Sequence, residues 1–200
     1  SKRELKHYKV NEKIQENRVV KETEQAYIYF GAPYNLKSDN EDIYKSRVAS
    51  FILGASGFGS RLMEEIRVKR GLAYSAYART SINRSNSYFS GHLQTKNENL
   101  EEAKALVKSE VKRFVDGGVT KDELDQAKRF LLGSEPLRNE TLSQRLSSSF
   151  TEYYRGFDLG HSKVELEKIE ALSLEDLNKF IKQHDEINNL SFSIVTDAKK

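Results

Sequence analysis

Apolar positions in the first part of the chain change between the spacing of strands and the spacing of helices. The aromatic-rich segment at 24–34 predicts a strand, which Gly31 and Pro33 end. Ser38 and Glu41 then have the spacing of a capping box and predict the start of a helix. One face of this helix carries Tyr44, Val48, Phe51 and Ile52. The glycine-rich sequence GASGFG ends it.

The next segment passes from a helix to a strand at a single glycine. Residues 60–70 place Leu62 and Ile66 on one side of a helix, and Gly71 suits the left-handed position that follows a helix. Beyond Gly71 the apolar spacing becomes two, which predicts a strand. One face of this strand is expected to hold Leu72, Tyr74, Ala76 and Ala78. Its predicted antiparallel partner is the segment at 85–95.

Longer helices fill the middle of the chain. Asn97 is expected to cap a helix that Gly117 and Gly118 end. The apolar face of that helix consists of Leu100, Ala103, Val107, Val111 and Phe114. Thr120 and Glu123 form a second capping box, which predicts another helix directly afterwards.

The last part of the chain is helical up to a closing strand. Pro136 interrupts the helical pattern. After it, the spacing resumes at Leu142, Leu146, Phe150 and Tyr153. Two shorter helices are predicted to start at Ser162 and Ser173, and residues 188–196 read as a strand.

Strands at the start, middle and end, with helices between them, indicate an α+β fold. We expect a mostly antiparallel sheet with helices packed on one face. Because no Pro/Gly/Ser-rich linker divides the chain, we expect a polar leader at 1–20 and a single domain at 21–200.

Composition and charge exclude several function classes. The 33 basic and 30 acidic residues leave a net charge of +3, which is too even for a nucleic-acid binder recognised by its charge. The lack of cysteine excludes a disulfide scaffold and a thiolate metal site. No apolar run approaches the roughly 18–20 residues that cross a bilayer. We therefore expect no nucleic-acid partner and no membrane span.

The sequence also lacks the usual catalytic motifs. Its four histidines are His7, His92, His161 and His184. No two of them are three or four residues apart, so no zinc motif of the H-x-x-E-H or H-E-x-x-H type is present and we expect no metal site in this chain. The order of glycines in GASGFG is the reverse of a dinucleotide fingerprint, and the loop follows a helix. A flexible corner between two helices is the better interpretation.

Arg67 and Tyr74 lie seven residues apart around Gly71. Considered alone, Arg67 belongs to a basic cluster at a solvated helix end, where cations are favourable. The cluster comprises Arg61, Arg67, Lys69, Arg70, Arg79 and Arg84. If these residues have purely structural roles, the adjacent Glu64 and Glu65 are solvated and Tyr74 is a core tyrosine.

A longer stretch of the sequence favours a different interpretation of Arg67 and Tyr74. The sequence ILGASGFGSRLMEEIRVKRGLAYSAYART resembles the C-terminal half of insulinase-like (pitrilysin-type) zinc peptidases, which include the mitochondrial processing peptidases. The segments FSGHLQTKNENLEEA and GVTKDELDQAKRFLLGS continue the similarity, which covers nearly the whole chain from about residue 20. The block at 53–80 is specific, whereas the later helices are weak signals alone.

The resemblance implies a two-half, chamber-forming enzyme. The absent N-terminal half would bind zinc through H-x-x-E-H, and this half would close the chamber and supply an Arg and a Tyr. Arg67 and Tyr74 occupy those places, as catalytic and substrate-binding residues; the spacing selects Arg67 over Arg70. The implied partners are the homologous zinc half, a peptide substrate and further copies of the chain.

Two alternatives remain open at this stage. The short GASGFG loop favours the interpretation that this chain is one half of a catalytic chain or of a homodimeric bacterial enzyme. The chain alone is expected to be inactive. The second interpretation is an inactive peptidase-like subunit that binds peptides or serves in assembly. In either case we expect a soluble protein of the bacterial cytoplasm or periplasm.

Overall fold

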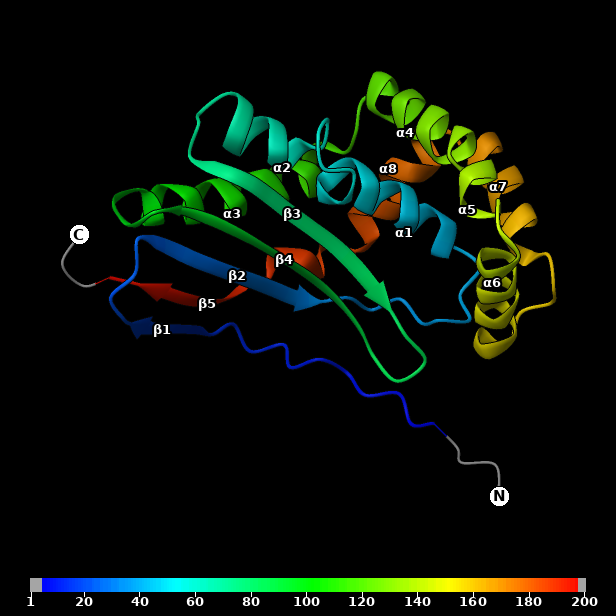
Figure 1. The fold of residues 1–200 in the computed structure, drawn as a ribbon, viewed down its shortest axis with the longest axis horizontal. Helices are drawn as coiled ribbons and strands as arrows, with labels where there is room; N and C mark the ends of the chain where they lie inside the picture. Colours follow the sequence, from blue (N-terminus) through cyan, green and yellow to red (C-terminus); the bar gives the residue numbers. More distant parts are fainter. Residues whose placement is uncertain (1–4, 198–200) are drawn as a thin grey trace.

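The structure, a computed structural model, describes residues 5–197 and contains one mixed sheet with helices on one side (Figure 1). Five strands lie in the order β1-β5-β2-β4-β3. Neighbouring strands are antiparallel except β1 and β5, which are parallel. The strands are β1 (Glu16–Val20), β2 (Gln25–Pro33), β3 (Ala73–Ile82), β4 (Ser87–Lys96) and β5 (Ser191–Thr196). The predicted α+β class is confirmed.

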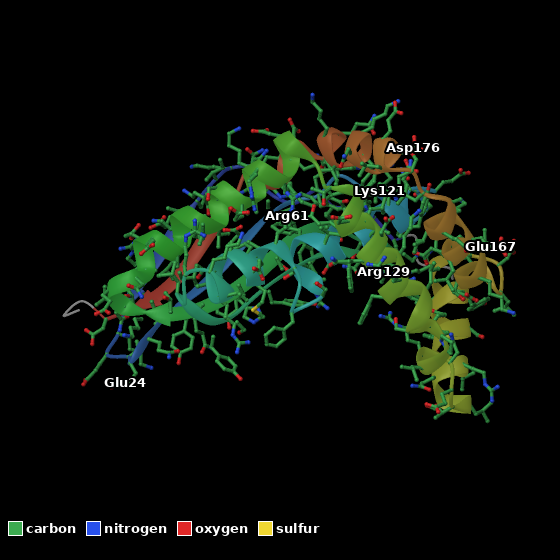
Figure 2. All side chains as sticks on the ribbon, turned by 90° about the horizontal axis from the view of Figure 1, so that it is seen from above. Glu24, Arg61, Lys121, Arg129, Glu167 and Asp176 are labelled. Carbon is green, nitrogen blue, oxygen red and sulfur yellow. The ribbon has the colours of Figure 1, made fainter. Side chains whose placement is uncertain are left out.

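The helices follow the sheet in two runs. Between β2 and β3 lie α1 (Ile43–Ser50), the π-helical η1 (Phe51–Ala55), α2 (Arg61–Met63) and the π-helical η2 (Glu64–Val68). After β4 come the 3-10 turn η3 (Asn97–Asn99), α3 (Leu100–Gly117), α4 (Lys121–Gly133), α5 (Glu135–Arg138), α6 (Leu142–Arg155), α7 (His161–Ala171), α8 (Leu174–Gln183) and the 3-10 turn η4 (Asp185–Asn188). Seen from above, α6 lies at one end of the molecule (Figure 2).

The core lies between the sheet and these helices. Alternation along β2 buries Ala26, Ile28 and Phe30, while Tyr27 and Tyr29 face solvent. The predicted apolar face of the long helix is confirmed, because its five members are all buried in α3. The capping box of Thr120 and Glu123 also forms at the start of α4. These elements give the sheet one covered face and one open face.

The π-helical turn η1 lies directly on the edge strand β3. A Cβ atom added at Gly54 would be 2.8 Å from the backbone nitrogen of Ala78 and 2.9 Å from its Cβ. Only a residue without a side chain permits this approach. The turn and the strand are therefore in backbone contact.

Two predicted helix starts are wrong. The first helix begins at Ile43, not in the capping box of Ser38 and Glu41, because Asn40 accepts a 2.7 Å hydrogen bond from the N–H of Asp42 and holds a turn there. Asn97 does not cap α3 either. Its amide donates to the carbonyl of Thr23 (3.0 Å) and accepts from the hydroxyl of Thr196 (2.9 Å), so it joins the end of β4 to the β1–β2 connection and to the end of β5.

The segment expected to be a polar leader contributes a strand. Residues 16–20 form β1, which pairs with β5 from Glu16 opposite Phe192 to Val20 opposite Thr196. All five side chains are exposed, so the strand shows no alternation for a pattern to detect. A domain boundary near residue 20 stays a prediction.

Candidate functional site

The candidate site lies where η2 meets β3, and a buried serine builds the loop before it. Ser60 is fully buried, and its hydroxyl donates to the carbonyl of Gly57 (2.8 Å). The same oxygen accepts from the N–H of Met63 and so caps α2. Gly57 and Gly59 have φ of 69° and 91°, a region that favours glycine. The turn places Phe58 at the surface, with 72% of the side chain exposed.

Gly71 reverses the chain between helix and strand. Its φ is 63°, and its N–H donates to the carbonyl of Arg67 (2.9 Å). The N–H of Leu72 donates to the carbonyl of Ile66 (2.9 Å), six residues back, which is one residue further than in the usual end of an α-helix at a glycine. The wider π turn of η2 accounts for this shift. The carbonyls at the helix end are thus satisfied, and Arg67 faces the start of β3.

A β-bulge exposes Tyr74, contrary to the face assigned by alternation. The pairing of β3 with β4 shifts between Ala73, opposite Thr95, and Ala76, opposite Leu93. The extra residue interrupts the period of two. Ala76 is therefore 1% exposed whereas Tyr74 is 81% exposed. The interpretation of Tyr74 as a core tyrosine is wrong.

The structure brings Arg67 and Tyr74 together. The guanidinium carbon of Arg67 lies 4.7 Å from the ring centroid of Tyr74 and 4.6 Å from that of Phe58. Both distances suit cation–π attraction. Arg67 is half-buried, and within residues 5–197 its guanidinium has neither a hydrogen-bond acceptor nor an ion-pair partner. Phe58 escaped the sequence reasoning because only the turn of GASGFG directs its ring to Arg67.

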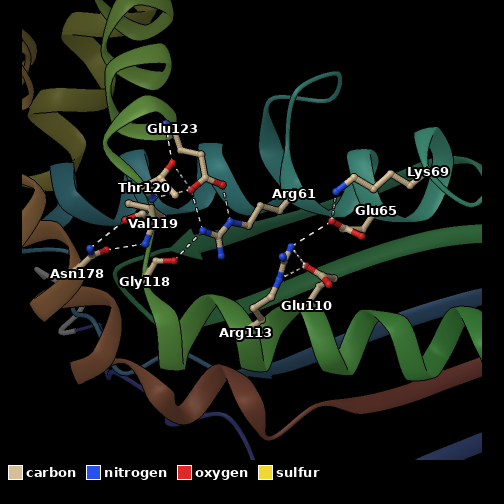
Figure 3. Close-up of polar contacts among 10 residues, drawn as sticks. All are labelled: Arg61, Glu65, Lys69, Glu110, Arg113, Gly118, Val119, Thr120, Glu123 and Asn178. Atoms are coloured by element: carbon tan, nitrogen blue, oxygen red, sulfur yellow. Dashed lines mark hydrogen bonds and ion pairs between the residues drawn. The ribbon is translucent and has the colours of Figure 1, made fainter.

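The helix that carries Arg67 is fastened to its neighbours by Arg61 (Figure 3). The Arg61 guanidinium donates to both carboxylate oxygens of Glu123 on α4, at 2.6 and 2.8 Å, and to the carbonyl of Gly118 at 2.7 Å. It also lies 5.4 Å from the ring centroid of Phe114. Arg61 is therefore a packed structural residue, which the expectation of a solvated basic cluster missed.

A second ionic cluster surrounds Glu65, also drawn in Figure 3. Glu65 is 6% exposed and accepts from Lys69 (2.6 Å) and Arg70 (2.7 Å), while Arg113 on α3 lies 3.3 Å away. The hydrogen bond from Lys69, followed by that from Arg70, lowers the pKa of Glu65 to about 2. The expectation that Glu65 is solvated is wrong. Arg70 is engaged in this cluster, so Arg67 alone of the two faces the candidate site.

The described part of the chain contains no set of metal ligands. Among residues 5–197, no three His, Cys, Asp or Glu side chains converge as metal ligands would. None of the helices in that range combines the length and apolarity needed to cross a bilayer. The junction of η2 and β3 offers two hydrogen-bond donors, the guanidinium of Arg67 and the phenol of Tyr74, beside the rings of Phe58 and Tyr74.

Curated proteins are similar to this chain in sequence. A protein from Helicobacter pylori named "Non-peptidase homolog YmxG" is 48% identical over 97% of this chain and 45% of its own length. A Bacillus subtilis protein named as a zinc protease, also YmxG, is 27% identical over 82% of this chain and 39% of its own. This chain thus spans less than half the length of these curated relatives.

A solved structure agrees with the fold. The peptidase M16 inactive domain from Pseudomonas fluorescens superposes with a TM-score of 0.85 at 24% identity, over 93% of this chain and 44% of that one. The family model described as "Peptidase M16 inactive domain" matches residues 1–131. The predicted resemblance is confirmed, and relatives carry both zinc-protease and non-peptidase names. This chain belongs to the family of peptidase M16 inactive domains.

Proposed function

We propose that this domain is the zinc-free half of a zinc metallopeptidase, closes one side of the substrate chamber and contributes Arg67 and Tyr74 to the substrate site. One observation carries the proposal. The Arg67 guanidinium lies 4.7 Å from the ring of the exposed Tyr74 and, in the described range, has no acceptor of its own. Donors arranged in this way are free to bind an acceptor from another molecule.

A peptide carbonyl is the acceptor that this pair suits. When a nucleophile attacks it, its oxygen gains negative charge, and fixed donors stabilise that charge best where water is excluded. The planar guanidinium donates from several N–H groups and the phenol from one O–H, so neither residue has to act as a base. The zinc, which would activate the attacking water, has no ligand set among residues 5–197 and is assigned to a homologous N-terminal half.

A second candidate function is peptide binding or assembly without hydrolysis. The name of the H. pylori relative, a non-peptidase homologue at 48% identity, favours it. In that case Arg67 and Tyr74 would hold a peptide carbonyl that is never cleaved. Self-association of the chain is part of both proposals, because the surfaces between halves would otherwise be uncovered.

The test uses the parent protein with an unstructured protein substrate such as casein. Tyr74→Phe is expected to lower kcat by about 10²–10³, the usual effect of losing one oxyanion donor. Arg67→Lys is expected to be similarly damaging, because an ammonium cannot reproduce the fork. Arg129→Lys, at an exposed arginine of α4, is the matched control and should leave activity unchanged.

Each outcome separates the candidates. Full activity of Tyr74→Phe with an unchanged melting temperature would show that the proposed role is wrong. A wild-type parent protein that binds casein without cleaving it, and loses that binding in Arg67→Lys, would instead favour the second candidate. Zinc content of both variants should equal that of wild type, because neither residue is assigned to the metal.

A further inference from the structure

We propose that Phe58 is a positioning residue that fixes the Arg67 guanidinium for its acceptor. The inference rests on the proposed function of Arg67 and Tyr74 and adds a third residue to that site. It starts from an aromatic side chain that is 72% exposed and lies 4.6 Å from the guanidinium carbon. An exposed ring packed on a cation restricts the arginine without requiring a carboxylate.

The loop that carries Phe58 is held in its conformation by hydrogen bonds. Besides the hydroxyl bond of Ser60 to the carbonyl of Gly57, the N–H of Ser60 donates to the same carbonyl (3.1 Å). A Cβ added at Gly57 or Gly59 would meet no atom within 4 Å, so their left-handed φ and not crowding selects glycine there. The fully buried Ser60 anchors the turn, and the turn fixes the direction from which the Phe58 ring reaches Arg67.

Two rings on one guanidinium have a chemical consequence. The N–H groups of arginine lie in the guanidinium plane, whereas aromatic rings contact its flat surface. Phe58 and Tyr74 therefore restrict the Arg67 guanidinium by contact with their rings and occupy none of its N–H groups with a carboxylate, which leaves those groups for an acceptor. Carboxylate partners would do the opposite, because they occupy the edge. Arg70, whose guanidinium donates to Glu65, shows this engaged arrangement three residues away.

The decisive variants are Phe58→Leu and Phe58→Tyr. Phe58→Leu keeps an apolar side chain but removes the ring, and in the casein assay it should lower kcat/KM roughly 3–10-fold. Phe58→Tyr keeps an aromatic ring and should keep the wild-type rate. In an Arg67→Ala background Phe58→Leu should have no further effect, because a positioning residue acts only through the residue it positions. Leu159→Ala, at another exposed apolar residue (74%), is the control and should be silent.

A second measurement on the isolated chain does not depend on peptidase activity. In nuclear magnetic resonance spectra, the ring currents should displace the Nε–H signal of Arg67 from its solvent-exposed position, and Phe58→Leu should return it part of the way, because the Tyr74 ring lies at a similar distance and stays in place. An Arg67 signal that Phe58→Leu leaves unmoved would overturn the inference.

The activity arms distinguish the two proposals. A silent Phe58→Leu beside damaging Tyr74→Phe and Arg67→Lys variants would overturn the role of Phe58 alone. A loss of equal size in the wild-type and Arg67→Ala backgrounds would do the same. Silence of all variants in an active parent protein would overturn the proposed function and this inference together.

Discussion

Arg61→Ala tests how much the attachment of α2 to α4 contributes to the stability of the domain. The side chain of Arg61 is 12% exposed and that of Glu123 is 27% exposed. The variant removes two bonds to the Glu123 carboxylate, one to the carbonyl of Gly118, and the contact with the ring of Phe114. It leaves a half-buried carboxylate without its cation.

The expected cost follows from that burial. Removing one partner of a buried ion pair costs about 3–5 kcal/mol, whereas exposed pairs contribute about 0–1 kcal/mol. Glu123 retains the backbone N–H of Thr120 (2.7 Å) and is partly hydrated, so the lower limit applies and we expect a loss of about 3 kcal/mol. For a chain of 200 residues, this corresponds to a fall in Tm of about 6–12 °C.

Urea unfolding followed by circular dichroism measures the change in the free energy of unfolding. Lys121→Ala is the matched control, because it removes an ion pair of the same helix whose side chains are 73% and 36% exposed. It should change stability by less than about 0.5 kcal/mol. A double-mutant cycle with Glu123→Gln isolates the pair. A loss below about 1 kcal/mol for Arg61→Ala, or a coupling energy near zero, would refute this reasoning.

Three further predictions concern other parts of the fold. The pKa of Glu65 falls from 4.5 to about 2 on folding, so its contribution to stability is present above pH 4.5 and is lost as the pH falls toward 2. Glu65→Gln should therefore flatten this part of the acid-unfolding curve, and an unchanged curve would contradict the ion cluster. Gly91→Ala would place a Cβ 2.3 Å from the Phe30 ring and should cost about 1–3 kcal/mol by urea unfolding, unlike Gly117→Ala, whose Cβ meets nothing within 4 Å. Tyr34→Phe removes a buried 2.9 Å hydrogen bond to Ser46 and should cost about 1 kcal/mol by calorimetry; no loss would mean that Thr80, 3.0 Å from Ser46, compensates fully.

Local sequence patterns predict correctly those features of the fold that depend on only a few neighbouring residues. The apolar face of α3 and the capping box at Thr120 are encoded within a few residues, and both form as predicted. The face of Tyr74 was not predictable in this way, because the bulge at Ala73–Ala76 depends on pairing with β4. Alternation assigned Tyr74 to the core, and only the three-dimensional register shows that it is exposed.

The ionic contacts could not be predicted from the sequence for a related reason. Glu65 has neighbours of opposite charge at Lys69 and Arg70, but Arg113 comes from another helix 48 residues away. Similarly, Arg61 finds Glu123 after 62 residues. A cluster of basic residues therefore looks solvated until the fold supplies its acceptors. The Arg67 and Tyr74 pair was found through family resemblance, since neither residue is distinctive alone.

The backbone contact between η1 and β3 has a consequence for how the domain can vary. Gly54 and Ala78 occupy one shared volume, so a larger residue at either position forces the other element away. Homologues that carry this arrangement should change the two positions jointly. In chimeras between such domains, residues 51–82 should be exchanged as one piece. A junction placed inside that segment would combine a turn and an edge strand shaped for different neighbours, and would misplace Tyr74 even if each parent domain were intact.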